Sequence, residues 1–292
     1  MTIRKSGTIT LGEIGTEYKD ARPNSISEFR GRLWLLKPSL RNTPTSFSQF
    51  YGARNVVTID VLGTSKNYSI EIALKSRRVN DAGIVYLNIN SGSRIGSSST
   101  GLPAMRTGIN CGALGAVIHL HVKKNAHIIG KGGNGGSGGS NSNGGNGLRG
   151  GDGLRVESSG RTVRITNEGV IAGGGGGGGG GGSSKFCFKA TKAKCTKYGT
   201  NTGQGGRAGV GDTNGSNGAR NRTTSSIAKK SSAGGIGGVG GAWGKSGGRG
   251  SDGSGGTTNW KGGGGGAPGY AVRKVAGSTV YVKVGDIRGA RQ

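Results

Sequence analysis

The distribution of glycine limits what this chain can fold into more than any other feature of its sequence. Of the 68 glycines, 52 fall between positions 130 and 269, often in pairs or runs, and residues 173–182 are all glycine. A segment of this composition has few side chains with which to build a hydrophobic core. The chain therefore divides into an ordinary first half and a glycine-rich second half.

Three kinds of structure are compatible with abundant glycine, and the sequence excludes one of them. Collagen needs glycine at every third position and abundant proline, whereas this chain has five prolines and its glycines are clustered. A flexible linker is the default expectation for sequence rich in Gly, Ser and Asn. However, the glycines form separate cassettes at residues 132–139, 173–182, 234–241 and 262–266, and a linker does not require such segmentation.

The third kind is polyglycine II. Several cassettes show a three-residue spacing, which matches the three residues per turn of an extended left-handed helix without internal hydrogen bonds. Such helices can hydrogen-bond to one another when they pack side by side, and only glycine lets the backbones approach closely on every side. We therefore predict that residues 130–292 form a domain of packed polyglycine II helices, with the segments between cassettes emerging as loops.

Residues 53–129 carry the apolar alternation of an ordinary small β domain. Residues 55–62 and 68–74 alternate apolar and polar side chains around a short turn, which predicts a β hairpin. Residues 84–89 and 116–122 continue the β pattern. Because helical periodicity is scarce, we predict a mainly β first half with little or no α-helix in the chain.

Residues 1–52 contain Pro23, Pro38 and Pro44, which make a long continuous helix unfavourable there. We predict an attachment segment for other protein subunits, with a plain linker as the alternative. A short Ser/Thr-apolar phrase that ends at glycine recurs at residues 8–15, 25–31 and 46–52.

The net charge of the chain is strongly positive. Forty Lys and Arg face 13 Asp and Glu, a balance of +27, which favours polyanionic partners such as nucleic acid, phospholipid headgroups or phosphorylated lipopolysaccharide. Neither a long apolar run nor an apolar stretch after Met1 occurs, so we expect synthesis in the cytoplasm without membrane insertion. Cys111 stands alone, and whether Cys187 and Cys195 form a disulfide is left open by their spacing.

No catalytic or cofactor site is predicted. His119 and His121 share one face of a predicted strand, which makes them weak candidates for metal ligands in a trimer, whereas His127 has the context of a solvent-facing residue. Neither a Ser-His-Asp nor a Cys-His arrangement can be inferred, and the Gly-Lys at residues 130–131 lacks the Ser or Thr of a phosphate-binding loop.

A glycine-rich nucleic-acid-binding protein is the main alternative from another functional class. Scattered Arg-Gly steps at residues 149–150, 249–250 and 288–289 favour it. Regular Arg-Gly-Gly repeats with interleaved aromatic residues do not occur, and the positive charge is spread over both halves. We therefore place this interpretation second and expect no nucleic-acid partner.

A β-like run that leads into glycines occurs twice, at residues 122–133 and 165–175. These runs contain Gly-Lys-Gly-Gly-Asn-Gly at residues 130–135 and Asn-Glu-Gly-Val-Ile-Ala-Gly at residues 167–173, and the chain approaches its end with Gly-Asp-Ile-Arg-Gly-Ala-Arg at residues 285–291. Together they resemble the distal adhesins of T-even-type phage long tail fibres, over roughly residues 116–292. The first half departs from that pattern.

The resemblance implies a stack of polyglycine II helices whose intervening loops recognise an outer-membrane protein or lipopolysaccharide. It also implies a place in the virion, at the distal tail or tail fibre, with other tail or fibre subunits as partners of the N-terminal half. A tip adhesin and a fibre subunit both remain open, and a purely structural tail subunit is a further alternative.

Residues 183–202 are the first candidate for receptor contact, because lysines meet phosphate and aromatic faces meet sugar rings. Alternatively, Phe186 and Phe188 pin this loop onto the scaffold. Trp243 is either a contact residue or a scaffold plug. The predicted receptor-binding residues are Lys185, Phe186, Phe188, Lys189, Lys192, Lys194, Lys197, Tyr198, Arg220, Arg222, Trp243, Trp260 and Lys261.

Overall fold

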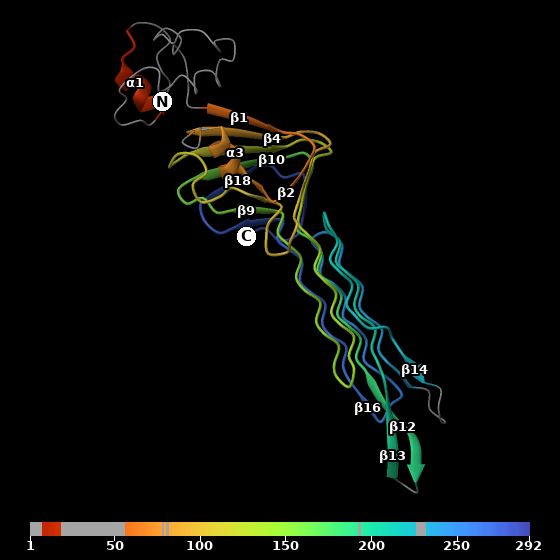
Figure 1. Cartoon of the computed structure of the whole chain (residues 1–292). Helices are drawn as coiled ribbons and strands as arrows, with labels where there is room; N and C mark the ends of the chain where they lie inside the picture. The colour runs from red at the N-terminus through yellow and green to blue at the C-terminus, as the bar shows by residue number, and fades with distance from the viewer. Residues whose placement is uncertain (1–7, 19–55, 78, 80–81, 192–193, 226–231) are drawn as a thin grey trace.

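The computed structural model describes residues 8–18, 56–77, 79, 82–191, 194–225 and 232–292. Over these residues the chain is mostly strand and extended segment, with two short helices, α1 (Leu11–Tyr18) and α3 (Ile70–Ser76). Figure 1 shows a β body from which a long bundle of extended segments projects, with a hairpin at its far end. The prediction of a mainly β chain with little α-helix is confirmed. None of the described helices is long and apolar enough to cross a membrane.

Three parallel sheets build the β body, and the chain visits them in turn. The first sheet contains β1 (Val56–Val61), β4 (Ile84–Ile89), β7 (Val117–Val122), β10 (Thr162–Asn167) and β18 (Ser278–Lys283). The second contains β2 (Thr64–Lys66), β5 (Arg94–Gly96), β8 (His127–Ile129), β11 (Val170–Ala172) and β19 (Asp286–Arg288). The third contains β3 (Tyr68–Ser69), β6 (Met105–Arg106), β9 (Leu154–Val156) and β17 (Val272–Lys274). Successive turns therefore stack as a three-sided parallel β helix.

Aliphatic side chains stacked in register form the core of this β helix. In the first sheet Ile59 pairs with Leu87, Leu87 with Leu120 and Leu120 with Ile165, and all four are buried. Each fully buried Ile or Leu contributes roughly 1.5–3 kcal/mol to folding. The similar runs at residues 122–133 and 165–175 are explained by this stacking, because β8 and β11 lie in register as neighbouring turns.

The predicted hairpin of residues 55–62 and 68–74 is wrong. Strand β1 forms, but it pairs in parallel with β4, and most of the second segment is helix α3. Ser69 caps this helix by accepting a hydrogen bond from the backbone N–H of Ile72, and a Glu71–Lys75 ion pair spans one turn. The alternation misled because Ile70 and Leu74, four residues apart, also define the buried face of a short helix.

Helix α1 lies within the predicted attachment segment and begins with a capping box. The Thr10 hydroxyl accepts from the backbone N–H of Glu13, and the Glu13 carboxylate accepts from the backbone N–H of Thr10. Thr-x-x-Glu fixes the start of this helix locally, and the first recurring phrase runs into it. The phrases at residues 25–31 and 46–52 lie outside the described residues.

The glycine bundle is inserted into two turns of the β helix. Residues 130–153 connect β8 to β9, and residues 173–271 connect β11 to β17. Both insertions therefore leave the second sheet and return to the third, beside one another (Figure 1). The β helix itself continues with β9 to β11 and β17 to β19, so a division at residue 129 does not separate the sheets from the glycine segments.

Residues 173–182 form the centre of the bundle, and residues 174–182 hydrogen-bond to six other segments with a period of three. Their N–H groups donate in rotation to carbonyls of residues 145–151, 204–210 and 245–251, as for Gly177 to Leu148, Gly178 to Arg207 and Gly179 to Gly248. Their carbonyls accept from residues 133–139, 235–241 and 263–269 in the same rotation, as for Gly178 from Gly136, Gly179 from Gly238 and Gly177 from Gly266. The backbone is thus satisfied in all directions without a side chain.

Close approach of the backbones accounts for glycine at these positions. A Cβ placed on any of residues 173–182 would overlap a carbonyl group of a neighbouring segment. The same holds for Gly263, whose Cβ would meet the carbonyl of Gly145. At Gly264 the nearest atom is the Asn146 Oδ1, at 3.5 Å, so a methyl group fits there.

These two neighbours provide a matched test of the packing. We expect Gly263→Ala to lower the free energy of unfolding by about 1–3 kcal/mol or more, because the methyl group forces two backbones apart. Gly264→Ala is expected to be neutral or stabilising by up to about 1 kcal/mol, because it restricts the unfolded chain without a clash. Urea unfolding of both variants measures the difference, and equal stability of the two would contradict the close packing.

Candidate receptor-binding surface

The distal end of the bundle, which we define as the end farthest from the β helix, gathers several segments that are far apart in sequence (Figure 1). A hairpin projects there, made of β12 (Ser184–Thr191) and β13 (Lys194–Asn201). The strands β14 (Thr224–Ser225), β15 (Ser232–Ala233) and β16 (Thr258–Asn259) lie at the same end. The segment predicted as a loop is therefore a hairpin on a shared base.

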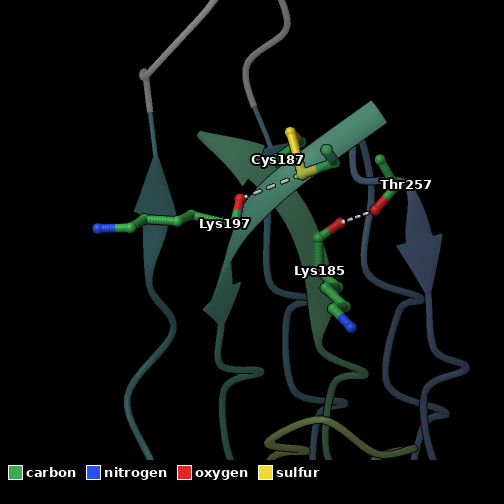
Figure 2. The surroundings of a disulfide bond; sticks show 5 residues. Lys185, Cys187, Lys197 and Thr257 are labelled. Carbon is green, nitrogen blue, oxygen red and sulfur yellow. Dashed lines mark hydrogen bonds between the residues drawn. A yellow bond between two sulfur atoms is a disulfide. The ribbon is translucent and has the colours of Figure 1, made fainter. Parts of the chain in front are cut away.

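Hydrogen bonds anchor the base of this hairpin. Strand β12 pairs with β16 on its other side, and the Thr257 hydroxyl donates to the Lys185 carbonyl at 3.1 Å, as Figure 2 shows. The Asn201 amide donates to the Ser232 hydroxyl at 2.8 Å, where both side chains are buried. The hairpin therefore has a fixed orientation relative to its neighbours.

A disulfide joins Cys187 and Cys195 across the two strands (Figure 2). Next to the disulfide in sequence, the Phe186 ring of β12 lies over Gly199, its direct partner in β13. This contact lies within the hairpin, and a side chain at position 199 would collide with the ring. The glycine is thus part of the hairpin's side-chain packing.

Cationic and aromatic groups lie together on the hairpin. The Lys185 ammonium lies 4.2 Å from the centre of the Tyr198 ring, a cation–π contact, and Tyr198 is 49% exposed. Lys197 is exposed. Lys192 and the side chains of Phe188, Lys189 and Lys194 lie outside the described part of the chain.

The other predicted residues, except Trp243, also lie at the distal end. Arg220 and Arg222 are exposed at the distal end, where the Arg222 Nε donates to the Gly234 carbonyl at 2.7 Å. Trp260 is half-buried and Lys261 exposed at the same end, and the Trp260 backbone N–H donates to the Ser183 carbonyl. The hairpin, the two arginines and the Trp260–Lys261 pair are therefore brought to one end.

Trp243 lies at the opposite, β-helix end of the bundle. Its ring meets His127 edge to face at a centroid distance of 6.3 Å, and the Arg288 guanidinium lies 5.3 Å from its centre. The ring is half-buried between the bundle and the second sheet, which fits the scaffold-plug interpretation. Burial and the nearby guanidinium groups of Arg94 and Arg288 lower the pKa of His127.

Positive charge dominates the described part of the distal end. Asp252 is the acidic residue there, and it is engaged by Arg249 at 2.7 Å. Lys185, Lys197 and Lys261 have no carboxylate within ion-pair distance among the described residues. An anionic ligand would meet these cations without first displacing a protein carboxylate.

The histidine pair does not come together with further metal ligands in the described residues. His119 stacks on Tyr86 with ring centroids 4.7 Å apart, and burial with the nearby Arg164 lowers its pKa. The Nε2 of His121 lies 3.4 Å from the Glu168 carboxylate. The described neighbours of the two histidines are thus Tyr86, in β4, and Glu168, directly after β10.

Two features of the distal half of the bundle were not predicted from the sequence. Thr257 and β16 complete the sheet of the hairpin, although short polar runs such as this one carry no strand signal. A polar pocket of about 460 Å³ is lined by Gln204, Arg207, Asn217 and Arg220. The three-residue spacing of Gln204 to Arg207 and of Asn217 to Arg220 is the signal that could have identified it.

These observations define the class of the protein: a three-sided β helix that carries its loops at the end of a projecting glycine bundle. The family described as phage tail fibre adhesin Gp38 matches residues 56–292, and the chain belongs to this family. This match confirms the resemblance to phage tail fibre adhesins that the sequence motifs indicated. The family is one of adhesins and not of enzymes, and its members belong to the phage tail.

A comparison with solved structures found a similar chain in the crystal structure of the gp37-gp38 adhesin tip complex of the bacteriophage S16 long tail fiber. The two are 20% identical with a TM-score of 0.43, and the match covers 99% of this chain and 100% of the other. A search of curated proteins found no match.

The three cysteines should differ in reactivity. Burial raises the pKa of the Cys111 thiol to about 12, whereas Cys187 and Cys195 lie half-exposed in the disulfide. After mild reduction of the folded protein, we expect alkylation of Cys187 and Cys195 but not of Cys111, since the thiolate is the reactive form. Peptide mass mapping gives the result, and unfolding before alkylation is the control that should add Cys111. Labelling of Cys111 in the folded state would contradict its burial.

Proposed function

We propose that the protein attaches the phage to its host by binding a cell-surface receptor with the distal end of the glycine bundle. The observation that supports this most is that the hairpin lies at the end farthest from the β helix (Figure 1) and that hydrogen bonds hold Arg220, Arg222 and Trp260 on the segments beside it. Loops displayed in this way are accessible to a large receptor, and they can vary in sequence without disturbing the bundle.

The bundle that holds these loops is, we propose, a polyglycine II domain. Its support is the three-residue rotation of hydrogen bonds between residues 174–182 and the six neighbouring segments. An extended helix with three residues per turn directs successive N–H and C=O groups outward in that rotation. Since the neighbours engage every backbone group, the bundle is stiff enough to position its loops.

The chemistry of the distal end favours an anionic glycan or an acidic protein surface. Lys185, Lys197 and Lys261 offer cations, and Tyr198 offers an aromatic face. Lipopolysaccharide or an outer-membrane protein of the host is the receptor class that this combination fits. The opposite end, which carries α1 and β1, is free to mount the protein on other tail fibre subunits (Figure 1).

Charge reversal at the distal end tests this function. We expect the double variant Lys197→Glu, Lys261→Glu to bind host cells at least about tenfold more weakly than the wild type, because two cations that face the receptor become repulsive. The matched control is Lys124→Glu, Lys274→Glu, which makes the same charge change at exposed positions of the β-helix region. Binding of the purified proteins to intact Gram-negative cells is measured by flow cytometry.

Equal loss in both double variants would show non-specific charge attraction and would overturn the distal assignment. Full binding by the distal variant would remove these two lysines from the receptor surface. If the wild-type protein bound no tested host, the role of a structural tail subunit would be favoured instead.

A further inference from the structure

Two arginine side chains line the polar pocket on the side of the bundle. It lies between residues 204–207 and residues 217–221, which run beside one another through hydrogen bonds from Gly205 N–H to the Arg220 carbonyl and from Gly218 N–H to the Gly206 carbonyl, both 2.9 Å. Arg220 therefore lies opposite Gly205, and Gly218 lies opposite Gly206, on the neighbouring segment. The two arginines enter the pocket from different segments.

Among the described residues, Arg207 and Arg220 lack the carboxylate partner that Arg149 and Arg249 have. In a segment with three residues per turn, residue i+3 lies on the same side as residue i. Arg149 and Arg249 use that position for Asp152 and Asp252, at 2.8 and 2.7 Å.

For Arg207 and Arg220 the corresponding residues are Val210 and Thr223, and neither guanidinium has an ion pair among the described residues. Two uncompensated cations therefore line one pocket. This arrangement favours an anion as its occupant.

The two amide side chains of the pocket are oriented to donate. The Asn217 Oδ1 accepts from the Ala208 backbone N–H at 2.8 Å, and the Gln204 Oε1 accepts from the Gly237 backbone N–H at 3.4 Å. Because their oxygens are engaged by backbone N–H groups, the NH₂ groups of both amides remain for a ligand. Four side chains then supply N–H donors, which suits an oxyanion.

One residue of the pocket has an unfavourable backbone conformation. Arg220 has a φ of +86°, and the other non-glycine residues with positive φ in the described chain are asparagines. A long side chain is unfavourable in this conformation, and strain of this kind is often retained at binding sites. A glycine would relieve the strain but would remove the guanidinium.

We propose that this lateral pocket binds the phosphate group of a phosphorylated sugar. It is a second contact site for the receptor, on the side of the bundle next to its distal end, with which it shares Arg220, and it rests on the proposed adhesin function. The pocket volume of about 460 Å³ lies in the range of small-molecule sites. Arg207 and Arg220 hold the phosphate oxygens, and Gln204 and Asn217 donate to the same group or to adjacent sugar oxygens.

Titration of the full chain with glucose 1-phosphate at low ionic strength tests the proposal, followed by amide NMR shifts. We expect saturable binding in the millimolar range for this sugar, none for glucose, and competition by inorganic phosphate. Glucuronate serves as the carboxylate arm, and tighter binding of glucuronate than of glucose 1-phosphate would overturn the assignment to phosphate.

Arg207→Gln and Arg220→Gly are each expected to weaken binding about tenfold or more, because each removes a charge-assisted hydrogen bond. Arg249→Gln removes the same charge elsewhere on the bundle and should leave the affinity unchanged. Arg220→Gly should also keep or raise the melting temperature, so its loss of binding cannot come from unfolding. Equal weakening by Arg249→Gln, or no saturable binding by the wild type, would overturn the proposal.

The outcome can be distinguished from that for the proposed function. Cell binding that persists without any affinity for glucose 1-phosphate removes the lateral pocket and leaves the adhesin function intact. Affinity for the sugar phosphate without cell binding keeps the pocket and removes the proposed function.

Discussion

The backbone hydrogen bonds of residues 173–182 are the interaction on which the displayed loops depend. A buried N–H or C=O without a partner costs about 1–3 kcal/mol, so a bundle without side chains is stable only if nearly every such group is paired. Here each of the ten N–H groups has a backbone acceptor: those of residues 174–182 donate to three segments in rotation, and that of Gly173 donates to the Arg288 carbonyl. The condition is that neighbouring backbones come within hydrogen-bond distance on all sides, which a Cβ would prevent. Glycine is therefore required by packing and not by flexibility.

The β helix holds the ends of the bundle segments in place. Its stacked aliphatic ladders form a conventional core, and the bundle grows out of two adjacent turns between the second and third sheets. Because the entropic cost of closing a loop grows only slowly with length, about 0.6 kcal/mol per doubling, a long insertion is tolerated where its ends are already fixed. Sequence can change at the distal loops while the register of β11 and β17 stays anchored by Ile171 and Val272.

Much of this organisation could be predicted from the sequence, and the failures have physical causes. Strands at residues 84–89 and 117–122 were predictable because their alternation matches the burial of every second residue. The segment at residues 68–74 was not, because a run with apolar residues at 70, 72 and 74 fits both a strand and one turn of helix, and the Ser69 cap and the contacts of α3 decided between them. The parallel pairing of β1 with β4 is non-local and has no sequence signal.

In the candidate site, too, local features could be predicted from the sequence and contacts between distant segments could not. Cations and aromatics of residues 183–202 marked the hairpin as a surface feature, but its anchoring by Thr257 and Ser232 depends on segments that are distant in sequence. Trp243 could not be placed from sequence, since its contacts with His127 and Arg288 come from the β helix. Local composition therefore indicates what a segment can bind, whereas the bundle decides which segments meet.

Hydrogen–deuterium exchange of the backbone amides of residues 173–182 tests the central claim most directly. If the glycine bundle is held by its backbone hydrogen bonds, these ten amides, which have no side-chain cover of their own, should exchange orders of magnitude more slowly than in an unfolded chain. Their protection should approach that of the β-helix strands β4 and β7. Exchange at the rate of an unstructured glycine linker would contradict the account.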